Sequence, residues 1–171
     1  EQPQFKIPED SNIQWYNATD YISNEPVRKS PQYNLVYDGW KRNEMRTSQS
    51  LSGFVLGKGF GKDKGDKVNY EINILPGKEK GMIGFRYNTP KGKTSTFQVK
   101  GITESRLELQ GTGEYSIVSI PYSCKEPGKY TLELTSEGTY STDLDGFFIG
   151  SEEDIKQIKI LPRKLSFIPE I

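Results

Sequence analysis

Hydrophobic and polar residues alternate with a period of two along several short segments of the chain. The clearest is Val68–Ile74, in which every second residue is hydrophobic and the residues between are Asn or Glu. Tyr130–Leu134 repeats this alternation. A turn containing Pro and Gly follows the first segment and another precedes the second. This pattern predicts β-strands that bury one face and leave the other in water.

Shorter segments of the same kind predict further strands, and no long amphipathic helical segment lies between them. Strands separated by turns containing Gly or Pro are typical of antiparallel pairing, and two such sheets packed face to face bury their hydrophobic faces together. We therefore expect an all-β protein, an antiparallel β-sandwich of the jelly-roll kind. The shorter predicted strands are Leu35–Trp40, Phe54–Leu56, Met82–Tyr87, Thr96–Val99, Leu107–Leu109, Tyr115–Tyr122 and Leu144–Ile149.

The two ends of the chain differ from this middle part. Residues 1–11 are polar, contain two prolines and are interpreted as a lead-in to a domain at 12–150. Ser151 precedes three acidic residues, an arrangement that caps the start of a helix and predicts a short helical turn. Pro162 and Pro169 exclude a long helix beyond it. We interpret 151–171 as a tail that packs on the sandwich or leads toward a further domain.

The amino-acid composition supports the all-β fold class and excludes several catalytic mechanisms and an internal disulfide. The 171 residues suit one domain, and a single Ala disfavours a helical bundle. The absence of His excludes the Ser-His-Asp and Cys-His mechanisms, and one Cys cannot close an internal disulfide. Equal numbers of basic and acidic residues, 23 each, give no overall field that attracts nucleic acid, and no apolar run is long enough to span a membrane.

A glycine-rich stretch, Gly57–Gly65, invites comparison with loops whose backbone amides bind phosphate. It matches neither common phosphate-loop pattern, and a predicted strand follows where a helix should begin. The sequence favours a hairpin or inter-sheet loop with solvated lysines.

Asp143 and Asp145 lie two positions apart and therefore on the same side of a predicted strand. Asp145 enters an apolar run that we expect to be buried, so its carboxylate needs a cation or backbone amides as partners. Calcium, which takes oxygen ligands, and a structural hydrogen-bonded aspartate are both open interpretations. Two acids can also hydrolyse glycosides, but they must face each other across a cleft, which neighbours on one strand rarely do.

Several aromatic residues adjoin Gly, Asn, Ser or Asp in or beside predicted loops, among them Trp40, Tyr87, Tyr115 and Tyr140. Sugar rings stack on aromatic planes while polar side chains bind their hydroxyl groups, so such residues are candidates for sugar binding. The alternative is that each tyrosine belongs to the core and only its hydroxyl reaches the surface.

In their order along 12–150, these segments resemble carbohydrate-binding modules of families 6 and 35, which have the galactose-binding-like β-sandwich fold. The segments that carry the resemblance are Gly53–Leu56, Gly65–Ile72, Ile83–Tyr87, Thr112–Tyr115, Pro127–Leu132 and Leu144–Ile149.

The resemblance implies a sugar-binding cleft among the loops at one end of the sandwich. Matched position by position, its residues are Phe54, Tyr115 and Asp143, where the family usually has Tyr in place of the first and Asn in place of the last. The family's structural calcium implies Asp145 as a ligand, whereas the acidic ligand of the first strand has no counterpart in Ile13–Ala18.

The expected function is non-catalytic binding of a polysaccharide or oligosaccharide. The resemblance implies an accessory domain of a glycan-degrading enzyme that is secreted, periplasmic or at the cell surface, with a catalytic domain attached. Two alternatives are a structural module that packs on a catalytic domain without binding sugar, and a small glycan-active enzyme that depends on carboxylates.

Overall fold

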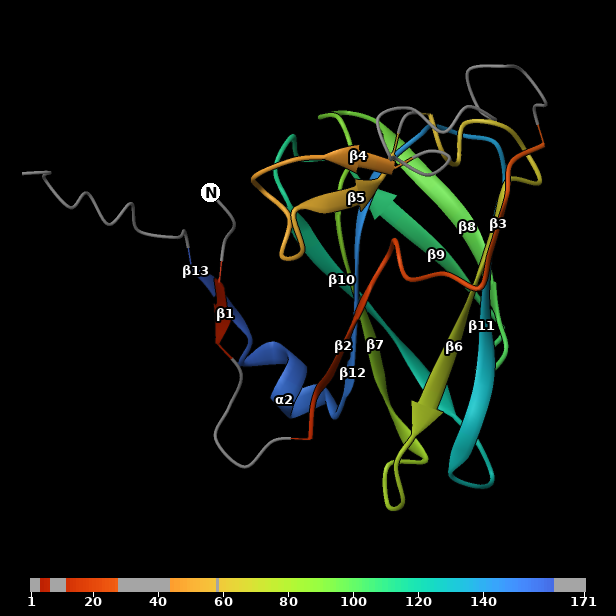
Figure 1. Cartoon of the computed structure of the whole chain (residues 1–171), viewed down its shortest axis with the longest axis vertical. Helices are drawn as coiled ribbons and strands as arrows, with labels where there is room; N and C mark the ends of the chain where they lie inside the picture. The colour runs from red at the N-terminus through yellow and green to blue at the C-terminus, as the bar shows by residue number, and fades with distance from the viewer. Residues whose placement is uncertain (1–3, 7–11, 28–43, 58, 162–171) are drawn as a thin grey trace, which may run out of the picture.

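The computed structural model describes residues 4–6, 12–27, 44–57 and 59–161. Their strands form two packed antiparallel sheets and a separate two-stranded ribbon (Figure 1). The predicted antiparallel β-sandwich is confirmed. The elements are β1 (Gln4–Lys6), β2 (Gln14–Asn17), β3 (Ser23–Glu25), β4 (Glu44–Arg46), β5 (Phe54–Leu56), β6 (Lys67–Ile74), β7 (Lys80–Asn88), β8 (Thr94–Lys100), β9 (Ser105–Gln110), β10 (Ser116–Ser123), β11 (Gly128–Ser136), β12 (Asp143–Gly150), α2 (Glu152–Lys156) and β13 (Lys159–Leu161).

The first sheet has the strand order β10-β7-β12-β5-β4, with β2 also paired to β12. The second has the order β3-β6-β11-β8-β9. Within the described residues no helix is sufficiently long and apolar to traverse a membrane. The predicted strand Leu35–Trp40 falls outside the described residues.

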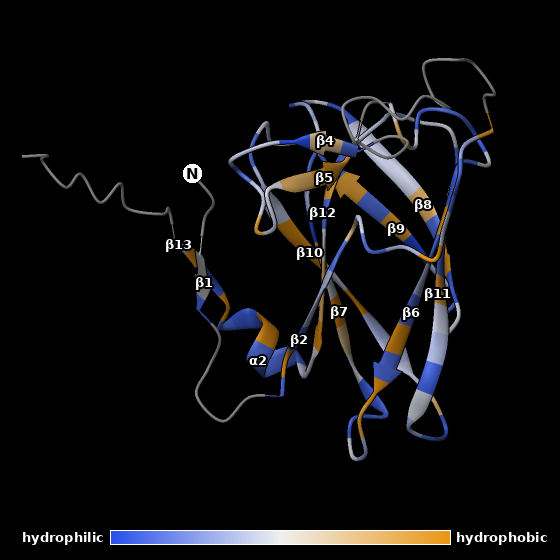
Figure 2. Cartoon of the chain, viewed as in Figure 1, coloured by the Kyte–Doolittle hydropathy of each residue, from blue (hydrophilic) through white to orange (hydrophobic). Residues whose placement is uncertain are grey.

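The alternating pattern places the core as expected. In β6 the four hydrophobic residues of Val68–Ile74 are all buried, and the opposite face is half-buried or exposed. Figure 2 shows the resulting hydrophobic and hydrophilic bands along the strands. Phe147 of β12 lies in the core, where its ring contacts those of Tyr16, Tyr70 and Phe85 at centroid distances of 5.0, 5.1 and 5.7 Å.

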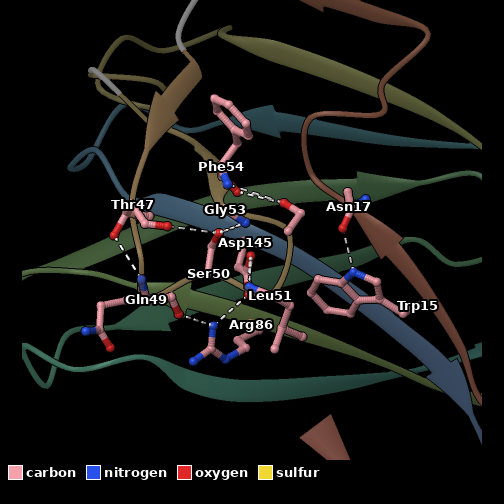
Figure 3. Close-up of polar contacts among 11 residues, drawn as sticks. Trp15, Asn17, Thr47, Gln49, Ser50, Leu51, Gly53, Phe54, Arg86 and Asp145 are labelled. Atoms are coloured by element: carbon pink, nitrogen blue, oxygen red, sulfur yellow. Dashed lines mark hydrogen bonds and ion pairs between the residues drawn. The ribbon is translucent and has the colours of Figure 1, made fainter. Parts of the chain in front are cut away.

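A β-bulge interrupts the register of β12 against β7 between Leu144 and Gly146. Leu144 and Phe147 both belong to the core cluster although they are three positions apart, because the bulge contributes one extra residue. Asp145, the extra residue, points to the outer face of this sheet, where it meets Arg86 (Figure 3).

The glycine-rich stretch is a loop between the two sheets, since β5 and β6 belong to different sheets. Its backbone amides at Gly61 and Asp63 donate to the carboxylate of Asp66, at 3.1 and 3.2 Å. Phe60 is fully buried and stacks on Phe97. These two loop amides are therefore bonded to a carboxylate of the chain itself, and the prediction of an inter-sheet loop is confirmed.

The segment after the last long strand packs on the sandwich. Ser151 caps α2 by accepting a hydrogen bond from the Asp154 amide, as predicted. Ile155 of α2 is buried, and a Cβ on Gly84 of β7 would lie 3.2 Å from its Cγ2 atom. β13 then pairs with β1, so the two ends of the described chain lie side by side (Figure 1).

Candidate functional site

The loop between β4 and β5 is a compact turn at one end of the sandwich. The Thr47 amide donates to the Gly53 carbonyl, and the Gly53 amide donates to the Ser50 hydroxyl at 2.6 Å. Gly53 has a φ of 95°, a conformation that a residue with a side chain adopts only with strain. These bonds close the turn within the loop itself.

A buried ion pair fastens this loop to the sheet below it. Arg86 of β7 donates through Nη1 to Asp145 Oδ2 at 2.6 Å and to the Gln49 carbonyl at 3.0 Å. The Leu51 amide lies 3.2 Å from both carboxylate oxygens of Asp145. Figure 3 shows Arg86 and Asp145 directly beneath the loop. The pair thus joins β7, β12 and the β4–β5 loop.

Burial raises the pKa of Asp145 to about 6, although its bonds with Arg86 and the Leu51 amide act in the opposite direction. At neutral pH the carboxylate therefore remains charged and balances the guanidinium. Burial also raises the pKa of Asp143. The Asp143 carboxylate lies against Gly57, where a Cβ would come within 2.6 Å of Oδ1.

Tyr115 lies over Arg86, with the guanidinium carbon 4.5 Å from the ring centroid. Burial raises the pKa of the Tyr115 hydroxyl, and the charges of Asp143 and Asp145 raise it further, while Arg86 and a hydrogen bond with Thr47 lower it. The hydroxyl is therefore neutral at every physiological pH. Asp143 is thus close enough to Tyr115 for its charge to act on the hydroxyl.

A hollow of about 390 Å³ opens beside Tyr115, and we call it the Tyr115 hollow. Its wall combines one aromatic ring with groups that form hydrogen bonds, and Ile160 of β13 completes it. The lining residues are Gln49, Arg86, Asn88, Gly113, Glu114, Tyr115 and Ile160.

Phe54 does not share this hollow. It lines a second hollow of about 260 Å³, formed by Arg46, Thr47, Ser48, Ser52, Gly53 and Phe54, which we call the Arg46 hollow. Figure 3 shows the Phe54 ring pointing away from Arg86 and Asp145. Of the three residues predicted for one cleft, Tyr115 and Phe54 thus line two separate hollows, and Asp143 lines neither of them.

The other predicted aromatic residues lie in different surroundings. Tyr87 is only 2% exposed, and its hydroxyl donates to the Gln110 carbonyl at 2.6 Å, so it follows the core alternative and presents no ring to the surface. Tyr140 is exposed in the β11–β12 loop, with Lys93 Nζ 5.5 Å from its ring centroid. Trp40 lies outside the described residues.

Sequence reasoning missed Arg86, Gln49 and Ile160. Arg86 was an ordinary polar position of a predicted strand, and its partner lies 59 residues away. The one available signal was the need of Asp145 for a cation or backbone amides. The structure supplies both, through Arg86 and Leu51.

Calcium does not fit at Asp145. Calcium takes six to eight oxygen ligands, whereas the partners of this carboxylate are a guanidinium and a backbone amide, which are N–H donors. Among the described residues, no three acidic, His or Cys side chains are grouped so that they could hold a metal ion. The structural alternative accounts for Asp145.

A chelator should therefore leave thermal unfolding unchanged. We expect the same melting temperature in about 5 mM EDTA and in excess calcium. Asp145 does not bind calcium, so calcium binding at this position cannot stabilise the folded state. Differential scanning calorimetry of the same preparation in both buffers measures this. A higher melting temperature in calcium would contradict the assignment.

No family model matches the sequence, and no curated protein matches it. Solved structures do match, over most of the chain. One is the C-terminal family 6 carbohydrate-binding module of the laminarinase LamC from Zobellia galactanivorans, with a TM-score of 0.57 and 17% identity over 82% of this chain and 100% of that one. Another is a family 35 carbohydrate-binding module from Clostridium thermocellum, with a TM-score of 0.54 and 14% identity over 82% and 99%.

A third is the family 6 module CsCBM6-3 from Clostridium stercorarium, solved in complex with cellobiose, with a TM-score of 0.53 and 20% identity over 81% of this chain and 92% of that one. Each of these matches covers almost the whole length of the solved module. The chain therefore has the β-sandwich fold of carbohydrate-binding modules of families 6 and 35.

Proposed function

We propose that this domain binds a polysaccharide or oligosaccharide without catalysis, at the end of the sandwich formed by the β4–β5 and β9–β10 loops. The observation that carries the proposal is the Tyr115 hollow. It places an aromatic ring beside the side chains of Gln49, Asn88 and Glu114, on a fold that carbohydrate-binding modules share. A sugar would stack its C–H face on the ring while its hydroxyl groups bind the polar side chains.

Non-catalytic binding agrees with the state of the two carboxylates considered for hydrolysis. Asp145 is held by Arg86 and by the Leu51 amide, so it is not free to protonate or attack a substrate. Asp143 lies two residues before it on the same strand. This arrangement does not provide two acids on opposite sides of a bound sugar.

The proposal includes the setting in which such a domain works. Similar structures include a module from a multidomain xylanase and a module from a laminarinase. By analogy, this domain belongs to a secreted or surface enzyme that degrades glycans, and it holds an attached catalytic domain close to its substrate. Weak binding suffices for this purpose because tethering raises the local concentration of the enzyme.

Affinity gel electrophoresis against a panel of polysaccharides tests the proposal. At least one polymer should slow the migration of the domain relative to a protein of similar size that does not bind sugar. The same panel should release no reducing ends on incubation with the domain. A lack of retardation by every polymer would instead favour a structural module, and release of reducing ends would favour an enzyme.

A further inference from the structure

Part of the wall of the Tyr115 hollow comes from outside both sheets. Ile160 lines the hollow together with Tyr115, but it lies on β13, which pairs with β1 in the separate two-stranded ribbon. The other lining residues have polar side chains, apart from Gly113. The Tyr115 ring and Ile160 are therefore the apolar surfaces of the hollow, and Ile160 is only half-buried in the free domain.

The short helix α2 places β13 next to the hollow. Ile155 of α2 is buried on the outer face of the first sheet, where a Cβ on Gly84 would lie 3.2 Å from both Ile155 and Ile117. Gly84 and Arg86 are two positions apart on β7 and share that face. Because Arg86 lines the hollow, α2 is anchored on a strand that also forms the hollow. The Ile158 amide donates to the Ile155 carbonyl at 3.2 Å, and β13 begins at the next residue.

The ribbon is short and forms a sheet of its own. Its strands have three residues each, and their pairing runs from Gln4 with Leu161 to Lys6 with Lys159. A two-stranded ribbon is at best marginally stable by itself in water, so this pairing should open more readily than that of the long strands in the sandwich. A molecule that contacts the sandwich and the ribbon together therefore stabilises the closed ribbon.

We propose that Ile160 contacts the bound sugar and that the sugar in turn holds the ribbon against the sandwich. This inference rests on the proposed function and adds to it a binding residue from outside the sandwich. A sugar unit stacked on Tyr115 occupies a hollow that Ile160 also lines, so C–H groups of that unit contact the isoleucine side chain. Asn88 and Glu114 of the sandwich bind its hydroxyl groups. Sugar binding and closure of the ribbon thus favour each other.

Truncation of Ile160 tests the contact. Xylan, laminarin and hydroxyethylcellulose are separate probes of the panel in affinity electrophoresis, and the polymer that slows the wild-type domain most is used for the variants. Ile160→Ala should weaken binding about fivefold, the loss of a partly buried aliphatic contact. Ile160→Val keeps most of the apolar surface and should bind within about twofold of wild type. Lys159→Ala is the matched control, because this neighbouring side chain is exposed and points to the other face of β13.

Hydrogen exchange of the ribbon amides gives a second readout, on the wild-type domain itself. Coupling between two events is reciprocal, so a contact that strengthens binding about fivefold lets saturating polymer slow exchange in β1 and β13 by about fivefold. Mass spectrometry with and without the polymer measures this. The turn between β6 and β7, at the opposite end of the sandwich, should exchange at the same rate in both samples. Ile160→Ala should lose the slowing, and Lys159→Ala should keep it.

The outcomes separate this proposal from the proposed function. If no polymer of the panel retards the wild-type domain, the proposed function fails and the role of Ile160 fails with it. If a polymer binds but Ile160→Ala binds as tightly as wild type, or exchange in the ribbon does not slow, sugar binding stands and the role of the ribbon is wrong. Equal loss in Ile160→Ala and Lys159→Ala would also overturn the proposal, because it would indicate a general loosening of the ribbon. Unchanged melting temperatures would show that the variants are folded.

Discussion

Replacing Tyr115 with alanine should weaken binding to the best polysaccharide of the panel by about 30-fold, which corresponds to about 2 kcal/mol for a central aromatic residue of a binding site. The ring forms the aromatic wall of the Tyr115 hollow and covers Arg86 at 4.5 Å. Alanine removes the stacking surface and leaves the buried Arg86–Asp145 pair more open to water. Affinity electrophoresis over a range of polymer concentrations gives the change in dissociation constant.

Two further variants separate stacking from other effects. Tyr115→Phe keeps the ring and loses the hydroxyl that contacts Thr47, so it should bind within about threefold of wild type, the loss of one ordinary hydrogen bond. Tyr130→Ala removes a half-buried tyrosine near the start of β11, at the end of the sandwich away from the Tyr115 hollow. This change should not affect binding. If Tyr115→Ala binds as well as wild type, the ligand lies elsewhere on the sandwich.

The long strands could be predicted because each contains enough residues to show the alternation of hydrophobic and polar positions by itself. The alternation in β6 and β11 marks the buried face of each strand without reference to the rest of the chain. The short strands β3 and β4 were missed, since three mostly polar residues display neither a period nor a hydrophobic run, whereas the equally short β5 consists of three hydrophobic residues. β1 was likewise hidden in a stretch interpreted as a lead-in, and only its pairing with β13 reveals it.

The candidate site was predicted less completely, because it depends on contacts between distant parts of the chain. Tyr115 and Asp143 were identified through a family resemblance; the charge of Asp143 acts on the Tyr115 hydroxyl, but Asp143 does not line the Tyr115 hollow. Phe54 was assigned to the same cleft, but the β4–β5 loop separates its hollow from that of Tyr115. The course of that loop is set by Arg86 and Asp145, whose pairing no local pattern indicates.

Tyr87 shows that two signals in one sequence can conflict. Its polar neighbour Asn88 suggested a loop residue, whereas the alternation of β7 placed it on the same face as Phe85, which is buried. The strand pattern decided the outcome, since a ring on the inner face of a sandwich is enclosed by the opposite sheet.

Removing the Asp145 carboxylate should cost more stability than any other single change considered. Asp145→Ala leaves Arg86 buried without its counter-charge and deprives the Leu51 amide of its acceptor. Breaking a buried pair by removing one partner typically costs about 3–5 kcal/mol. We expect a loss of that size in urea unfolding at pH 7.5, where a carboxyl group with a pKa of about 6 is charged.

The exposed pair of Arg106 and Glu108 provides the matched control, because Glu108→Ala removes one partner of an ion pair that water already solvates. That change should cost less than about 1 kcal/mol. Replacing Arg86 and Asp145 together, as Arg86→Met with Asp145→Ala, should recover part of the loss, since no buried charge then remains unpaired. A cost below about 1 kcal/mol for Asp145→Ala alone would mean that water reaches Arg86 and that the pair does not fix the β4–β5 loop. In that case the separation of the Tyr115 and Arg46 hollows would not be a rigid feature of this end of the sandwich, because the loop between them depends on the same contacts.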